Sequence, residues 1–244
     1  MSGHRLLVPH ASSASAPLRL EGAALHHLQV LRLGPGDALE VFDGEGNSWP
    51  AEVVHMERTH AVLRLGPKQR GHKSRPISLL QALPKADKLE LVLQKGTELG
   101  AHAFFPVLTE RVVLRLSTAS AEARLRRWQR IVEEAARQCG RLEVPTVHRV
   151  QGFLEAVRGL SPTTRVLVLD EEEKVVRLSE AARVDTEAPL ALLIGPEGGL
   201  ARSEVEAVKE LGAVSVSLGP LVLRTETAAL AALSVLRHLE GLLG

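Results

Sequence analysis

Hydrophobic positions change their spacing near residue 76, and this change predicts two regions. In residues 1–70, short apolar runs alternate with polar residues and turn signals. We expect strands at residues 6–8, 38–42, 51–54 and 61–65, and a short helix over 23–31 that the glycines of 34–36 end. Short strands at this spacing favour a small β-barrel domain.

From residue 77 onward, strand and helix patterns alternate. Segments rich in apolar residues predict strands over residues 77–83, 103–107, 166–169, 190–194 and 214–218, of which 190–194 is fully apolar. Helices are expected over residues 84–99, 120–139, 203–211 and 225–243. This alternation is typical of an α/β domain with a mostly parallel sheet that is covered on both faces. Residues 66–76 are polar and basic, which indicates a linker, so we predict domains at 1–70 and 76–244.

The helix expected over 120–139 combines an apolar stripe with a basic surface. Leu125, Trp128, Val132, Ala135 and Cys139 recur at steps of three and four, which predicts that they are buried. Residues 111–149 contain nine Arg and no Lys against four acids, although the net charge of the whole chain is only +1. This stretch is either a solvated helix face or a surface that contacts RNA phosphates.

Composition excludes several other functions. Aromatic residues are 2% of the chain and Tyr is absent, which excludes an aromatic stacking platform for single-stranded RNA. The ten His lack a zinc-ligand spacing and Cys139 is the only cysteine, so we expect no metal site and no disulfide. No apolar run approaches the length of a membrane span, and no signal peptide is recognised, which favours the cytoplasm.

Three predicted strand exits carry candidate chemistry. They are Leu169-Asp170, the glycine-rich segment 194–199, and the apolar segment 218–224. Ligands bind beyond the carboxyl ends of strands in an open α/β sheet, so these exits form one candidate pocket. The glycine segment matches neither a Rossmann motif nor a P-loop, and on its own it could equally be a tight turn into a helix.

Arg224 and Glu226 follow the third exit directly. Charged residues at a helix start usually cap the helix or pair with each other. Beside two ligand loops, they also become candidates for catalysis.

Several motifs together resemble one known family. They are Pro196-Glu197-Gly198-Gly199 with Glu204, Leu218-Gly219-Pro220, Leu223-Arg224-Thr225-Glu226-Thr227-Ala228, Gln94-Lys95-Gly96-Thr97-Glu98-Leu99-Gly100, and His26-His27 to Arg32. The chain resembles the RsmE family, bacterial 16S rRNA (uracil-N3)-methyltransferases of the SPOUT class. Val112 and Cys139 depart from the family pattern.

The resemblance implies a PUA-like β-barrel followed by a SPOUT-type α/β domain with a C-terminal trefoil knot. It implies S-adenosyl-L-methionine as cofactor, 16S rRNA or the small ribosomal subunit as partner, and a homodimer. The cofactor-binding residues would be Leu169, Ile194, Gly195, Pro196, Glu197, Gly198, Gly199, Leu218, Gly219, Leu221 and Leu223. RNA would be bound by Arg32, Arg111, Arg115 and Arg141.

Methylation of uracil N3 requires an unpaired base that loses its N3 proton. Arg224 is our candidate for stabilising the developing uracil anion. Glu226 would accept the proton or orient Arg224, unless the two residues only pair with each other to fix the helix start.

The sequence also permits other functions. A knotted methyltransferase could modify another base or a ribose 2′-hydroxyl. The chain could instead be a non-catalytic RNA-binding protein of ribosome assembly. A Rossmann oxidoreductase is disfavoured because no Gly-x-Gly-x-x-Gly follows a predicted strand.

Overall fold

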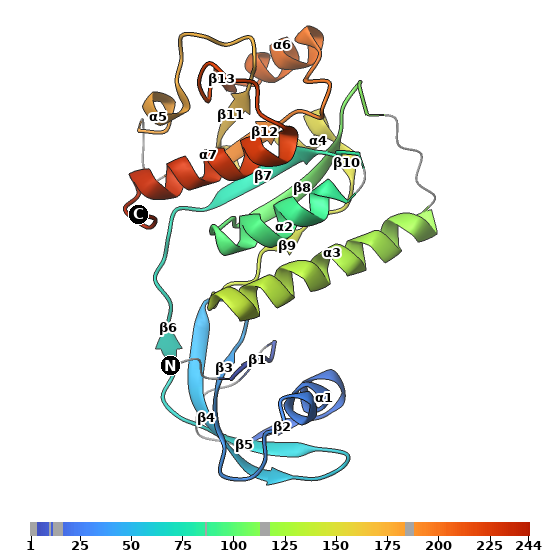
Figure 1. The fold of residues 1–244 in the computed structure, drawn as a ribbon, viewed down its shortest axis with the longest axis vertical. Helices are drawn as coiled ribbons and strands as arrows, with labels where there is room; N and C mark the ends of the chain where they lie inside the picture. The colour runs from blue at the N-terminus through green and yellow to red at the C-terminus, as the bar shows by residue number, and fades with distance from the viewer. Residues whose placement is uncertain (1–3, 10, 12–16, 86, 113–117, 184–187) are drawn as a thin grey trace. The chain divides into compact units, whose positions relative to one another are not determined.

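The computed structural model describes residues 1–244 apart from 1–3, 10, 12–16, 86, 113–117 and 184–187 (Figure 1). The chain forms two compact units, Met1–Lys73 with Ala136–Val144, and Ser74–Ala135 with Pro145–Gly244. Within the first unit, the Arg5 guanidinium donates hydrogen bonds to the carbonyl oxygens of Ala136, Arg137 and Arg141. These bonds tie a segment from the middle of the chain to the N-terminal strands. No helix among the described residues is long and apolar enough to cross a membrane.

The first unit is built on a six-stranded sheet. Its strands are β1 (Arg5–Leu7), β2 (Leu18–Leu20), β3 (Ala38–Phe42), β4 (Asn47–Met56), β5 (Ala61–Leu65) and β6 (Gln69–Arg70), with one helix, α1 (Gly22–Val30). The strand order is β1-β3-β4-β5-β2, and β6 pairs with β4. Leu28, Trp49 and Val53 are among the residues at the centre of its core. Strands β2 and β6 escaped prediction because two or three residues show no periodicity.

The second unit is built on a parallel sheet, as the sequence pattern predicted. Its strands are β7 (Ile77–Ala82), β8 (Ala103–Leu108), β9 (Thr146–Val147), β10 (Gln151–Gly152), β11 (Arg165–Leu169), β12 (Leu190–Ile194) and β13 (Val214–Val216). The order is β10-β8-β7-β12-β11-β13, β9 pairs with β8, and these pairings are parallel. All five residues of the central strand β12 are buried. The exits of β11, β12 and β13 therefore lie side by side at one edge of the sheet.

Helices cover both faces of this sheet. They are α2 (Lys88–Glu98), α3 (Thr118–Cys139), α4 (Phe153–Arg158), α5 (Leu178–Ala181), α6 (Arg202–Glu210) and α7 (Thr225–Leu239). Helix α7 packs against α2 and over β7 and β12, and Figure 1 shows both helices in front of the sheet. On the opposite face, Leu80, Val168 and Leu193 pack with α4 and α6.

Three sequence expectations are corrected here. Cys139 is exposed, and Ala136 takes the buried position at the end of the α3 stripe. Helix α7 ends at Leu239 rather than at residue 243, because Gly241 adopts a left-handed backbone with φ +71°. Strand β13 ends at Val216, two residues before the predicted end, so that Leu218 already belongs to the loop.

Candidate functional site

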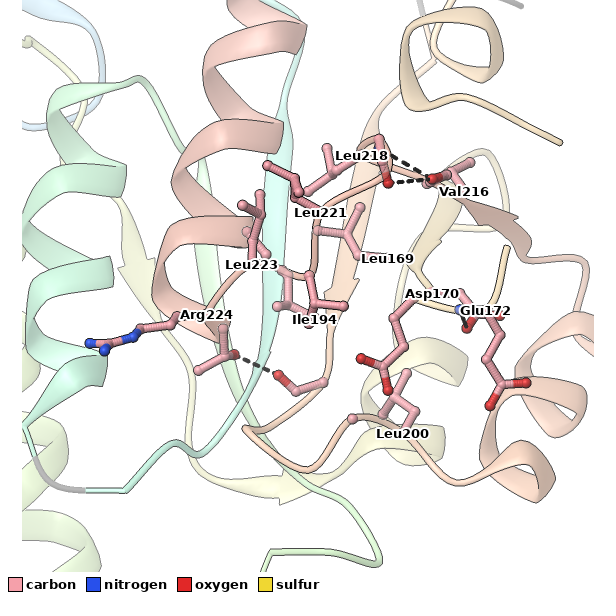
Figure 2. Close-up of a pocket in the computed structure, with 18 of the residues that line it drawn as sticks. Leu169, Asp170, Glu172, Ile194, Leu200, Val216, Leu218, Leu221, Leu223 and Arg224 are labelled. Atoms are coloured by element: carbon pink, nitrogen blue, oxygen red, sulfur yellow. Dashed lines mark hydrogen bonds between the residues drawn. The ribbon is translucent and has the colours of Figure 1, made fainter. Parts of the chain in front are cut away.

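The exits of β11, β12 and β13 surround a cavity of about 290 Å³, which we call the knot-loop cavity after the knot that the family resemblance implies (Figure 2). Its lining residues all fall within three segments, 169–174, 194–200 and 216–228. The register explains this convergence, because Leu169 lies opposite both Ile194 and Val216 at the ends of three neighbouring parallel strands. The expected pocket is therefore present.

Most of the residues predicted to bind the cofactor line the knot-loop cavity. These are Leu169, Ile194, Gly195, Pro196, Glu197, Gly199, Leu218, Gly219, Leu221 and Leu223. Gly198 is absent from this lining and lines a second cavity instead. The glycine-rich segment 194–199, which we call the glycine loop, therefore presents different residues to the two cavities.

One wall of the knot-loop cavity is an uncovered apolar loop. Leu221 and Val222 are 77% and 76% exposed, although large apolar side chains gain free energy by burial. The loop keeps its shape through the Ser217 hydroxyl, which accepts a hydrogen bond from the Gly219 amide at 3.2 Å. Gly219 has φ +126°, a conformation that disfavours any side chain. An ordered loop that exposes apolar side chains at a cavity is a ligand-binding feature.

Carboxylates line another part of the knot-loop cavity. Asp170, Glu171 and Glu172 follow β11 and belong to its lining. Arg202 at the start of α6 holds Asp170 through a bidentate pair, with N···O distances of 3.0 Å. Arg202 also pairs with Glu172 at 3.2 Å, and Lys174 lines the same cavity. Glu171 is the one carboxylate of the three without a cationic partner among the described residues, so it is the group that can meet a positively charged part of a ligand.

A network of polar side chains holds the glycine loop by hydrogen bonds. Gln81 at the end of β7 donates from Nε2 to the Thr225 hydroxyl at 2.8 Å. The Thr225 hydroxyl in turn donates to the Gly195 carbonyl oxygen at 2.5 Å, the bond drawn in Figure 2. Gln81 and Thr225 are 1% and 5% exposed. This network connects a strand end, the glycine loop and the start of α7, and sequence patterns gave no sign of it.

Arg224 and Glu226 have different surroundings. Arg224 is exposed and lines the knot-loop cavity, and in Figure 2 its guanidinium points away from the labelled apolar side chains. Glu226 is 9% exposed and lies outside that lining. Its carboxylate lies 3.6 Å from the Lys88 ammonium, which also contacts Glu197 at 2.9 Å. The partner of Glu226 among the described residues is therefore Lys88 and not Arg224, contrary to the simple pairing considered from the sequence.

Lys88 links the glycine loop to the start of α7. Its hydrogen bond to Glu197 raises the pKa of Lys88, so the ammonium stays charged at neutral pH. Burial would raise the pKa of Glu197, but the bonds from Lys88 and from the Lys85 amide lower it below its usual value. Both groups are therefore ionised, which fixes Glu197 in place at the cavity wall.

A second cavity, of about 550 Å³, lies on the other side of the glycine loop, and we call it the α3 cavity. It shares Pro196 and Glu197 with the knot-loop cavity. Its remaining lining consists of Leu83, Pro84, Lys85, Asp87, Leu89, Glu90, Arg111, Val112, Gly198, and Arg124, Arg127 and Trp128 of α3. Arg111 donates a hydrogen bond to the Gly198 carbonyl oxygen.

The predicted RNA-binding arginines are divided between the two units. Arg111 belongs to the second unit and lines the α3 cavity. Arg32 and Arg141 belong to the first unit, where Arg32 is exposed with φ +56° and Arg141 has a side chain 17% exposed. Arg115 lies outside the described residues. Sequence reasoning placed Arg124 and Arg127 only within the Arg-rich stretch 111–149, and it did not select Lys85 or Lys88, because their neighbours come from distant parts of the chain.

One group of potential metal ligands occurs among the described residues. His55, Glu57 and His60 lie on the β4–β5 hairpin, with ligand atoms within 4.8 Å of one another. Glu57 accepts a hydrogen bond from His55 Nε2 at 2.8 Å, and this bond is the main cause of its lowered pKa. The group is thus explained by its own ion pairs, and the absence of a metal site stays a prediction.

Comparison with known proteins identifies the class. A family described as RNA methyltransferase domain matches residues 72–237, and one described as RNA methyltransferase PUA domain matches residues 20–66. With the parallel sheet and the knot-loop cavity, these matches define a two-domain RNA methyltransferase with a PUA-like N-terminal domain.

Individual relatives specify the family. The chain is 35% identical to ribosomal RNA small subunit methyltransferase E of Bacillus subtilis, over 92% of this chain and 91% of that protein. The crystal structure of the Neisseria gonorrhoeae enzyme of the same name, bound to S-adenosyl methionine, superposes with a TM-score of 0.87 at 31% identity and covers 97% and 98% of the two chains. A putative methyltransferase from Legionella pneumophila, in complex with the same cofactor, gives 0.84 at 29% identity and covers 98% of each chain. The chain belongs to the ribosomal RNA small subunit methyltransferase E family, which confirms the resemblance.

Proposed function

We propose that this protein transfers the methyl group of S-adenosyl-L-methionine to N3 of a specific uridine in 16S rRNA of the small ribosomal subunit. The convergence of three strand exits on the knot-loop cavity carries the proposal. The structures of two relatives with 29–31% identity are complexes with this cofactor. Family membership supports ribosomal RNA as the substrate.

The residues of the knot-loop cavity fit S-adenosylmethionine. The exposed apolar loop at Leu221 and Val222 suits the adenine ring, and the Glu171 carboxylate after β11, which no described cation pairs, suits the positively charged sulfonium and amino groups. Glycines at 195 and 199 allow the backbone to approach the ligand closely. Bound there, the cofactor supplies an electrophilic methyl group.

The protein's own residues must align the uracil and stabilise its charge. Loss of the N3 proton leaves negative charge on the uracil oxygens, and a guanidinium beside the donor stabilises that charge. Arg224 is the candidate, because it lines the knot-loop cavity and no described acid pairs with it. Glu226 stays our candidate proton acceptor, and its pairing with Lys88 adds a second role in fixing the start of α7.

Replacing Arg224 by Ala tests this assignment. We expect methyl transfer to fall by roughly 10²–10³-fold, the cost typical of a lost charge-stabilising donor, while S-adenosylhomocysteine binds with nearly unchanged affinity. Calorimetry and single-turnover methylation measure the two properties separately. A normal transfer rate would remove Arg224 from the chemistry.

The reaction itself is tested on small subunits from a strain that lacks the enzyme. Nucleoside analysis after incubation with the protein and S-adenosylmethionine should show 3-methyluridine. A modified ribose or another base would instead support a related knotted enzyme with a different target, and failure to bind S-adenosylhomocysteine would favour a non-catalytic assembly protein. We further propose that the protein acts in the cytoplasm as a homodimer, which light scattering can measure. The trefoil knot stays a prediction.

A further inference from the structure

We propose that the α3 cavity receives the target nucleotide, with its base on the apolar floor and its phosphate at the basic rim. The inference rests on the proposed function and adds to it the place where RNA enters. It is carried by three observations on the second unit: the shared wall with the knot-loop cavity, the layout of floor and rim, and the charge balance.

The shared wall places the two cavities next to each other. Pro196 and Glu197 line both, whereas Gly198 lines only the α3 cavity and Gly199 only the knot-loop cavity. Methyl transfer requires donor and acceptor atoms to come within roughly 3–3.5 Å. A nucleotide in the α3 cavity would lie across this loop from the cofactor. Its base would have to extend past the edge of the loop to bring uracil N3 to the methyl group.

The lining of the α3 cavity has an apolar floor and a charged rim. Leu83, Leu89 and Trp128 are 4–6% exposed and form the floor. Lys85, Arg111 and Arg124 are exposed and belong to the rim. A volume of about 550 Å³ is within the range of small-molecule sites and suffices for one nucleotide. This layout fits a base that has left the stack while its phosphate stays near the surface.

The charges at the rim favour an anion. The acids Glu90 and Glu197 are already paired, the first with Arg127 at 2.7 Å and the second with Lys88 at 2.9 Å. By contrast, Lys85, Arg111 and Arg124 have no acidic partner among the described residues. Asp87 is the only lining acid without a described pair, so positive charge is in excess.

Helix α3 offers a matched control for the test. Arg124 lines the α3 cavity, whereas Arg126 is absent from its lining and pairs with Glu122 at 3.8 Å. Arg124→Ala and Arg126→Ala therefore remove the same charge from the same helix. We would measure the affinity of each variant for unmethylated small subunits at several salt concentrations.

Arg124→Ala should weaken binding about fivefold at 0.1 M salt and reduce the slope of log K against log salt by about 0.7, the values for one lost phosphate contact on single-stranded RNA. Arg126→Ala should change neither. Equal behaviour of the two variants would overturn the proposal. Because binding is measured, this result is independent of whether 3-methyluridine forms, which tests the proposed function alone.

Gly198→Leu tests the cavity without changing charge. A Cβ at Gly198 would meet only the Arg111 Cδ atom, at 3.6 Å, and its φ is not left-handed, so the backbone tolerates a side chain. The leucine would project beside Arg111 into the α3 cavity. We expect kcat/KM to fall at least about tenfold with unchanged S-adenosylhomocysteine affinity, since roughly 1.4 kcal/mol of lost binding suffices. Unimpaired methylation by this variant would exclude the α3 cavity as the nucleotide site.

Discussion

The hydroxyl of Thr225 provides the most quantitative test of the site. Thr225→Val keeps the shape of the side chain and removes both of its hydrogen bonds, the buried one from Gln81 and the partly buried one to Gly195. Each buried polar group left without a partner costs about 1–3 kcal/mol. Gln81 keeps one bond, to the Ala82 carbonyl oxygen at 3.1 Å, so we place the total loss at about 2–4 kcal/mol.

For a protein of this size, that loss lowers the Tm by about 4–16 °C. Calorimetry and urea denaturation measure it, with Thr225→Ser as the control that keeps the hydroxyl and loses only one methyl group, about 1 kcal/mol. The Gly195 carbonyl also loses the hydrogen bond that it accepts from Thr225, so S-adenosylhomocysteine should bind more weakly to the valine variant than to the serine variant.

A double-mutant cycle with Gln81→Leu tests whether the side chains of Gln81 and Thr225 stabilise each other. If the two side chains interact directly, Gln81→Leu should cost less in the Thr225→Val background than in the wild type. Stability of Thr225→Val within about 0.5 kcal/mol of the wild type, or strict additivity with Gln81→Leu, would show that the network contributes little.

Two further predictions concern the apolar loop at the knot-loop cavity and the stability of the protein at low pH. The double variant Leu221→Ser with Val222→Ser should leave the Tm unchanged, because both side chains are over three-quarters exposed. In calorimetry, it should bind S-adenosylhomocysteine about tenfold or more weakly than the wild type. Equal affinity would mean that the loop does not cover the ligand. Burial opposes ionisation of Asp43, but hydrogen bonds from Asn47 and from the Glu45 and Asn47 amides lower its pKa below 3.8. A lowered folded-state pKa stabilises the protein above the unfolded value, and this stabilisation is lost as pH falls through the folded value. Asp43→Asn should therefore be less stable than the wild type in urea at pH 7, and this difference should shrink as the pH falls below 3.8. A difference that stays constant over this range would contradict the assignment.

Elements with long apolar runs could be predicted from the sequence, and the shorter ones could not. Residues 190–194 match β12, because a strand buried on both faces is continuously apolar. Helix α7 was extended too far because Leu242 and Leu243 continue its apolar pattern beyond the left-handed Gly241. Helices α4 and α5, with six and four residues, are too short for a helical period to be recognised.

The knot-loop cavity could be predicted because its residues follow directly on predicted strands. The α3 cavity could not, since periodicity indicates which face of a helix is buried but not which loop the opposite face meets. Arg124 and Arg127 are exposed on α3, yet only the fold brings them to the same cavity as Pro196 and Gly198. For the same reason, Lys88 was not recognised as the partner of Glu226.

The strand at the centre of the second sheet is made late during synthesis. Strand β7 pairs with β12, whose first residue Leu190 lies opposite Ile77, more than a hundred residues earlier in the chain. Until β12 has left the ribosome, β7 has an unpaired edge next to exposed apolar side chains, a state prone to aggregation. Pairing over such a distance also slows folding, since the long loop must close first. We therefore expect nascent chains that end before residue 190 to require chaperones, and loss of the last fifty-five residues to open the middle of the sheet rather than shorten its edge.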